Sequence, residues 1–114
     1  MKLYDYYRSS GAFRVRIALN LKGLDAEREF VHLRRKDQLS EAFLRLNPQG
    51  LVPVLVDDDG TVLTQSMAIV EYLDETRPTE PRFMPADPAG RARVRAIAQA
   101  IACEIHPLNN LRVL

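Results

Sequence analysis

The sequence predicts an α/β domain built on a mixed four-stranded sheet, followed by the start of an all-helical region. Before Pro78 the hydrophobic patterns run in the order strand, helix, strand, short helix, strand hairpin and helix. A strand–helix–strand unit favours a parallel pair and a hairpin is antiparallel, so the sheet should contain both kinds of pairing. Beyond a proline-rich stretch the pattern is helical only. With 46% hydrophobic and 27% charged residues, the composition is that of an ordinary globular protein.

The first strand and the first helix open the chain. Residues 2–7 (KLYDYY) alternate enough to predict a strand, with Leu3 and either Tyr4 or Tyr6 facing inward. From residue 13 onward apolar side chains recur every four positions, which predicts a helix that begins near Gly11. The helix should end at Gly23, because glycine readily adopts the left-handed conformation that stops a helix. The side chains expected to form its buried stripe are Phe13, Ile17 and Leu21, widened by Val15, Ala18 and Leu19.

The rest of the α/β part follows from short apolar runs and from turn residues between them. The clearest hairpin signal is a pair of such runs separated by a DDDG turn. The remaining elements are expected at residues 27–33 (a strand with Phe30 at its centre), 40–46 (a short helix), 52–56 and 61–64 (the hairpin), and from a capping Ser66 to just before Pro78 (a helix).

The C-terminal part of the chain differs from what precedes it. Four prolines within residues 78–88 predict a linker, because proline has no backbone donor for regular structure. An amphipathic helix follows, and the chain stops at Leu114 with nothing to cover its apolar seam. We therefore expect a domain over 1–80, a linker over 81–88, and at 89–114 the first helix of an all-helical domain whose remainder is absent. The residues of the seam are Ile97, Ile101, Ile105 and Leu108.

Composition excludes several classes of function. The net charge is +1 and the only basic cluster, at residues 34–36, is short, so no nucleic-acid partner is expected. A single cysteine, Cys103, excludes an intrachain disulfide, a CxxC redox pair and a four-thiolate zinc site, and no metal is expected. No apolar run approaches the ~18 residues that span a bilayer, and no leader opens the chain. We expect a cytoplasmic protein without a membrane partner.

The stretch RSSGAFR, residues 8–14, lies at the turn from the first strand into the first helix. A helix N-terminus offers unpaired backbone donors and a positive dipole end, which favour an anion such as a thiolate or carboxylate. A serine hydroxyl can add a hydrogen bond, and glycine lets a ligand approach the backbone. The alternative is that a serine caps the helix and does nothing more.

Three further motifs could bind a ligand. Pro53 opens a strand at a sheet edge, where the free backbone of Val52 could pair with an extended peptide; it could also mark a strand start only. Gln65 and Ser66 stand at another helix N-terminus, which suits a carboxylate or a plain cap. His106 precedes a proline that should kink its helix, and a lone histidine is more often structural.

Each of these motifs is weak alone, but their order and spacing match one family. The stretches YYRSSGAFRVRIALNLKG, LNPQGLVPVL, QSMAIVEYLDETRP and IHPLNNLRVL closely resemble the zeta class of glutathione transferases, specifically the maleylacetoacetate isomerases. The resemblance covers essentially all 114 residues. It implies an N-terminal thioredoxin-like domain that binds glutathione, an all-helical C-terminal domain that completes the substrate site, and a homodimer.

The resemblance implies the position of the glutathione thiol. The thiol would lie over Ser9, Ser10 and the backbone of Gly11, Ala12 and Phe13, with Arg14 beside them. Ser9 is expected to donate to the thiolate, and Ser10 to cap the helix or to orient Ser9.

The resemblance also implies the residues along the rest of the tripeptide and at the substrate. Arg8 could bind a substrate carboxylate through its fork of donors. The other implied residues are Gln38 and His106 along the tripeptide, Val52 at its cysteinyl backbone with a cis bond before Pro53, Gln65 and Ser66 at the γ-glutamyl end, and Asn110, Leu111 and Arg112 in the second domain.

One position departs from the family pattern. The family turn commonly reads serine, serine, cysteine, and Gly11 stands third here. No thiol of the protein can therefore assist glutathione at this turn, and a thioredoxin or glutaredoxin role is excluded. A serine and the helix N-terminus already meet the physical need.

The implied activity is the glutathione-dependent cis–trans isomerisation of maleylacetoacetate to fumarylacetoacetate in tyrosine and phenylalanine catabolism. A thiolate adds to the conjugated double bond, the resulting single bond rotates and the thiolate leaves. A free thiol with a pKa near 8.5 is mostly protonated at neutral pH, so hydrogen bonds that lower this pKa favour the reaction. Alternatives are another small cis-diacid such as maleylpyruvate, conjugation or dehalogenation of α-halo acids, and a non-catalytic glutathione-binding fragment.

Overall fold

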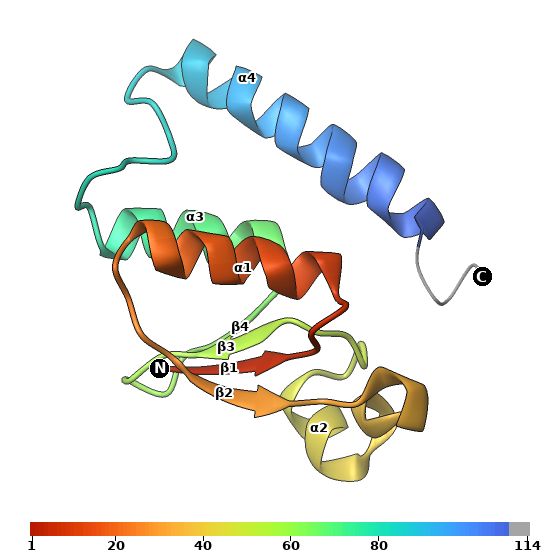
Figure 1. Cartoon of the computed structure of the whole chain (residues 1–114). Coiled ribbons are helices and arrows are strands. Elements are labelled where there is room, and N and C mark those ends of the chain that lie inside the picture. The colour runs from red at the N-terminus through yellow and green to blue at the C-terminus, as the bar shows by residue number, and fades with distance from the viewer. Residues whose placement is uncertain (110–114) are drawn as a thin grey trace.

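The computed structural model describes residues 1–109 and contains a mixed four-stranded sheet (Figure 1). The strands are β1 (Lys2–Asp5), β2 (Glu27–Phe30), β3 (Val54–Val56) and β4 (Val62–Thr64), in the order β2-β1-β3-β4. β1 pairs parallel with β2 and antiparallel with β3, and β3 pairs antiparallel with β4. The predicted combination of a parallel unit and an antiparallel hairpin is confirmed.

Two long helices lie side by side on one face of this sheet (Figure 1). They are α1 (Ser10–Leu21) and α3 (Ser66–Thr76). The short α2 (Glu41–Leu46) belongs to the connection between β2 and β3. α4 (Pro88–Gln99) crosses over α1 and α3 on the side away from the sheet (Figure 1).

The core fills the space between the sheet and the two helices. In the antiparallel register Leu3 lies opposite Leu55, and Leu55 lies opposite Leu63, so these leucines share one face of the sheet. Leu3 and Leu55 are fully buried, as are Ile69 and Leu73 of α3. The strand alternation of the sequence therefore identifies the inward face correctly.

The predicted buried stripe of α1 is confirmed for Val15, Ala18 and Leu19 and wrong for its other three residues. Phe13, Ile17 and Leu21 are 54%, 43% and 52% exposed. The buried residues of the helix are Gly11, Ala12, Val15, Ala18 and Leu19. This helix has two apolar faces, and the smaller side chains contact the sheet and α3, because they allow the helix to approach closely. A helical period alone cannot tell which face meets the sheet.

Several element boundaries also differ from expectation. β1 ends at Asp5, because the two tyrosines that follow already belong to the turn into α1. β2 ends at Phe30, which is exposed on the edge strand rather than central. β3 begins at Val54 instead of residue 52. The DDDG turn is confirmed: Gly60 takes φ +87° and donates to the carbonyl of Asp57 at 2.9 Å.

The proline-rich segment is irregular but anchored. No helix or strand lies between Thr76 and Pro88. The fully buried carboxylate of Asp74 accepts hydrogen bonds from Lys22 Nζ at 2.9 Å and from the backbone N–H groups of Phe83 and Met84 at 2.9 and 3.1 Å. Asp74 thus attaches this segment to α3 and, through Lys22, to the end of α1.

The C-terminal helix changes geometry along its length. α4 continues as a π-helical segment, Ala100–Ile105, and then as a 3-10 segment, His106–Asn109. A departure from α geometry near His106 was expected, since Pro107 cannot donate a backbone hydrogen bond, but it begins earlier, at Ala100. Arg95 Nε contacts Glu71 Oε1 of α3 at 2.7 Å. The four side chains of the predicted seam are exposed, and within residues 1–109 no helix is long and apolar enough to cross a membrane.

Candidate functional site

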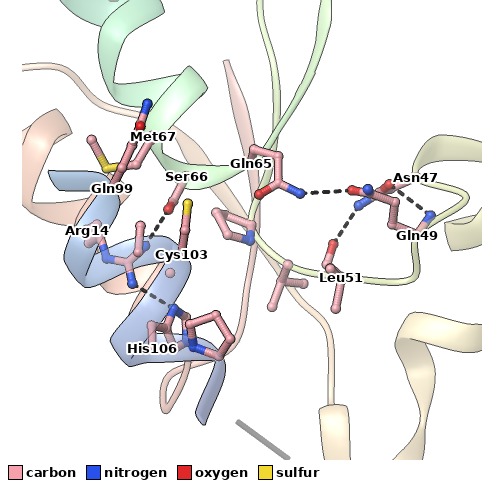
Figure 2. Close-up of a pocket in the computed structure, with 15 residues that line it drawn as sticks. Arg14, Asn47, Gln49, Leu51, Gln65, Ser66, Met67, Gln99, Cys103 and His106 are labelled. Carbon is pink, nitrogen blue, oxygen red and sulfur yellow. Dashed lines mark hydrogen bonds between the residues drawn. The ribbon is translucent and has the colours of Figure 1, made fainter. Parts of the chain in front are cut away.

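A pocket of about 330 Å³ opens where several segments meet (Figure 2). Its walls come from the N-termini of α1 and α3, from the loop before β3, and from the end of the C-terminal helix. The predicted site residues that line it are Gly11, Arg14, Val52, Gln65, Ser66 and His106. Residues distant in the sequence are therefore brought to one place.

The turn into α1 is built around Ser9. Ser9 is the N-cap: its Oγ accepts from the N–H of Ala12 at 3.1 Å, and its carbonyl accepts from the N–H of Phe13 at 2.9 Å. Ser10 is exposed and is already the first residue of the helix, so the expectation that Ser10 caps the helix is wrong. Ser9 caps because its backbone is still extended, with φ −77° and ψ 118°. Capping uses only an acceptor lone pair, so the Ser9 hydroxyl keeps a hydrogen to donate.

The N-terminus of α3 is built differently. Gln65 occupies the N-cap position without a side-chain cap, and Ser66 is the first helical residue, so the prediction that Ser66 caps the helix is wrong. The backbone of Gln65 has φ +70°, a conformation that costs a residue other than glycine ~1–3 kcal/mol. Such strain tends to occur at functional sites, and Gln65 and Ser66 both line the pocket.

The wall beside β3 presents free backbone. The Val52–Pro53 bond is cis, as the family resemblance implied. Within residues 1–109 neither the N–H nor the C=O of Val52 has a backbone partner. A Cβ at Gly11 would lie 3.2 Å from Pro53 Cδ and 3.7 Å from the carbonyl oxygen of Val52. Glycine therefore lets the start of α1 pack closely against this segment.

Arg14 connects the two remaining walls. One guanidinium nitrogen donates to Ser66 Oγ at 2.7 Å, and the other lies 2.6 Å from His106 Nδ1 (Figure 2). Burial lowers the pKa of Arg14, an effect that the nearby Cys103 opposes. Burial and then the charge of Arg14 lower the pKa of His106, which favours a neutral imidazole.

Some lining residues were not predicted from the sequence. Asn47 shapes the loop before β3: its Nδ2 donates to the carbonyl of Leu51 at 2.9 Å, and its Oδ1 accepts from the N–H of Gln49 at 3.1 Å. Gln49 Oε1 in turn accepts from Gln65 Nε2 at 3.1 Å (Figure 2). The NPQG turn was the available signal for this loop. Cys103 also lines the pocket, and nothing in its local sequence indicated this.

Other predicted residues lie outside the pocket. Ser9 precedes α1, and Ser10, Ala12 and Phe13 belong to the first turn of that helix. The Arg8 guanidinium lies 5.5 Å from the centre of the Tyr7 ring.

Gln38 does not line the pocket either, but its carbonyl oxygen lies close to Gly50 of the loop before β3. Its buried Oε1 has no hydrogen-bond partner among the described residues. Asn110, Leu111 and Arg112 fall outside the described residues. The part of the chain that the structure describes contains no cluster of His, Cys, Asp and Glu able to hold a metal ion.

Comparison with known proteins identifies the family. Residues 8–76 match the model of the glutathione S-transferase N-terminal domain. The chain is 52% identical to the maleylacetoacetate isomerase of Pseudomonas aeruginosa over 116 aligned positions, covering all of this chain and 54% of that protein.

Two solved structures share the fold. One is a maleylacetoacetate isomerase from Methylobacterium extorquens AM1 with bound malonate and glutathione, with a TM-score of 0.93 and 53% identity over 99% of this chain and 52% of that one. The other is the holo form of a bacterial maleylpyruvate isomerase of the zeta class, with a TM-score of 0.91, 53% identity and the same coverage. The chain spans about half the length of these relatives. By its sequence and its fold, the chain belongs to the glutathione S-transferase family, with the thioredoxin-like N-terminal domain of that family, and it is similar to zeta-class isomerases.

Proposed function

We propose that this chain is the glutathione-binding part of an isomerase that converts maleylacetoacetate to fumarylacetoacetate. The observation that carries the proposal is the combination, in one pocket, of free backbone groups at Val52 and an uncapped helix N-terminus at Gln65 and Ser66. An extended peptide can pair with the first, and a carboxylate suits the second. The printed names of relatives at 52–53% identity support the same activity.

The charge of the pocket fits an anionic peptide. Among its described lining residues Arg14 is a cation and none is a carboxylate. In the proposed pose the cysteinyl backbone of glutathione pairs with Val52, its γ-glutamyl carboxylate lies at the start of α3, and His106 and Gln38 lie along the tripeptide. Asn110, Leu111 and Arg112 complete this site in the proposal.

In the proposed pose the turn before α1 binds the thiolate of glutathione. Ser9 donates its hydroxyl hydrogen to the thiolate while it caps the helix, and the start of α1 adds a positive dipole end. Ser10, Gly11 and the residues that follow form the surface beneath the sulfur. When bound, glutathione supplies the nucleophilic thiolate, so the protein needs no nucleophile of its own. Its tasks are to hold the thiol ionised and to position the substrate.

The substrate proposed is a small cis-diacid, and Arg8 is proposed to bind one of its carboxylates. The guanidinium of Arg8 is a permanent cation beside the turn, which suits such a group. Maleylpyruvate is a second candidate substrate, because a structural relative at 53% identity bears that name.

The whole protein is proposed to be a cytoplasmic homodimer in tyrosine and phenylalanine catabolism. Its parts would be a glutathione-binding domain over 1–80, a linker over 81–88 and, from residue 89, an all-helical domain. The exposed seam of the C-terminal helix supports this proposal, because a contiguous apolar face normally meets other protein surface.

An assay of the full-length gene product tests the proposed activity. Isomerisation of maleylacetoacetate should require glutathione, and maleylpyruvate should be measured in parallel to rank the two substrates. An α-halo acid serves as a third substrate. The proposal is contradicted if neither cis-diacid is isomerised, or if isomerisation proceeds equally well without glutathione.

A further inference from the structure

Arg14 holds two pocket residues that come from distant parts of the chain. From α1 its guanidinium reaches Ser66 Oγ at the start of α3, at 2.7 Å, and His106 Nδ1 at the end of the C-terminal helix, at 2.6 Å (Figure 2). Two separate nitrogens make the two contacts. The planar fork of arginine can therefore fix both side chains at once.

The chemistry of arginine decides the proton positions of its partners. A guanidinium has donors and no acceptor. Nδ1 of His106 must therefore accept, so the ring is neutral and carries its proton on Nε2. Ser66 Oγ also accepts, so its own hydrogen points away from Arg14. Each partner is left with one donor for another group.

The surroundings of His106 favour the neutral ring as well. The titratable side chains that line the pocket with it are Arg14 from α1 and Cys103 from its own helix, and no carboxylate among the described lining residues would stabilise an imidazolium. Burial is the larger cause of the lowered pKa of His106, and the charge of Arg14 is the smaller one. A protonated ring would also place a second cation against a guanidinium.

We propose that Arg14 is a positioning residue that sets the His106 tautomer and the Ser66 hydroxyl so that both donate to oxygen acceptors of an anionic ligand. The acceptors that fit are carboxylate or peptide oxygens, next to the fixed charge of Arg14 itself. The identity of the ligand as glutathione rests on the function proposed above. The tautomer assignment rests on geometry alone and holds for the ligand-free protein.

Nitrogen-15 spectra of the histidine rings in the ligand-free full-length protein test the assignment directly. Long-range proton–nitrogen correlations distinguish a ring protonated at Nε2 from one protonated at Nδ1, and His106→Gln identifies its signals. We expect a single Nε2-protonated form, with a titration midpoint below the ordinary value of about 6.5. In Arg14→Met the midpoint should rise part of the way, because burial remains, and the two neutral tautomers should mix.

Binding of glutathione to the same variants tests the ligand part by calorimetry. Arg14→Met should weaken binding about tenfold or more, and Arg14→Lys should recover only part of this loss, because one ammonium keeps the charge without the fork. Arg45→Met is the matched control: among residues 1–109 this exposed arginine forms an ion pair with Glu41 of its own helix alone, and its loss should change neither the His106 tautomer nor the glutathione affinity.

Several outcomes overturn the inference. A proton on Nδ1 or an imidazolium at neutral pH in the wild type rules out the assignment, and this measurement needs no Arg14 variant. If the His106 tautomer and titration midpoint are unchanged in a folded Arg14→Met variant, Arg14 does not determine the tautomer. Normal glutathione affinity in that variant refutes the ligand part. Absence of glutathione binding by the wild type contradicts the proposed function and leaves the tautomer result standing.

Discussion

The N-termini of α1 and α3 both carry serine beside the pocket, but the two serines have different partners. Ser9 precedes α1 as an N-cap and accepts from the N–H of Ala12 within its own turn. Ser66 is the first residue of α3 and accepts from Arg14, which belongs to another helix. The residue before it, Gln65, has a positive φ and gives no side-chain cap.

Similar serine-containing motifs therefore leave the two helix ends different: a side chain caps α1, and none caps α3. The first N–H groups of a helix need partners from outside the helix. At α1 the turn supplies some of them, whereas at α3 no side chain caps the helix and the end faces the pocket. We therefore expect the α3 end to govern ligand affinity and the α1 turn to govern the reactivity of the bound thiol.

The largest expected effect concerns the thiol. Ser9→Ala removes one hydrogen bond to a charged group, worth ~1.5–3 kcal/mol. Since one pKa unit is ~1.4 kcal/mol, the pKa of bound glutathione should rise by about one to two units. The rate at neutral pH should fall about tenfold to a hundredfold and recover partly at alkaline pH, where the thiol ionises unaided. Thiolate absorbance titrated against pH measures this shift.

Ser40→Ala provides the matched control for that experiment. Ser40 caps α2 in the same way, accepting from the N–H of Phe43 at 3.2 Å, and it does not line the pocket. Both variants should lose ~1 kcal/mol of stability as helix caps. Only Ser9→Ala should move the thiol titration. If the thiol of bound glutathione titrates at the same midpoint in the wild type, in Ser9→Ala and in Ser10→Ala, Ser9 acts only as a helix cap.

The second effect concerns affinity. Gln65→Ala should weaken glutathione binding about tenfold, because a hydrogen bond to a charged group is worth ~1.5–3 kcal/mol. Ser9→Ala should change the affinity for glutathione less. The Ser9 hydroxyl contacts only the sulfur in the proposed pose, and the rest of the tripeptide keeps its contacts. Calorimetry on the two variants measures the difference. A larger loss for the serine variant would contradict the division between the two helix ends.

The smallest effect concerns the strained backbone of Gln65. Gln65→Gly should stabilise the fold by about 1 kcal/mol, because the removal of ~1–3 kcal/mol of strain exceeds the ~0.5–1 kcal/mol that the greater freedom of glycine in the unfolded chain costs. Gln65→Ala removes the same amide but keeps the strain, so it is the control. Urea denaturation compares their free energies of unfolding. A glycine variant less stable than the alanine variant by the full entropic cost of ~0.5–1 kcal/mol would show that the positive φ stores no strain.

Much of the fold could be predicted from local pattern. The strand alternation placed Leu3 correctly in the core, and the DDDG turn predicted the β3–β4 hairpin. The proline content predicted the irregular segment between α3 and α4. These features depend on near neighbours in the chain, which is why one sequence suffices to identify them.

The inward face of α1 could be predicted only in part: Val15, Ala18 and Leu19 are buried as expected. Its two apolar faces have the same period, and the sheet and α3 select the one with smaller side chains, leaving Phe13 and Ile17 exposed. The roles of the serines were also undecided, since Ser9, Ser10 and Ser66 all have the composition of caps. Only the backbone conformation at each turn distinguishes a cap from the first helical residue.

Local sequence pattern is enough to predict the kinds of element and their order and, through four matching motifs, the family. The assembly of the site depends on how the whole chain packs. This packing brings Arg14 to both Ser66 and His106, and it places Cys103 and the Asn47 loop at the same pocket. The physical reason is that helix and strand patterns arise from contacts between near neighbours. A hydrogen bond between residues 14 and 106 exists only after the sheet, α1, α3 and the C-terminal helix have packed together.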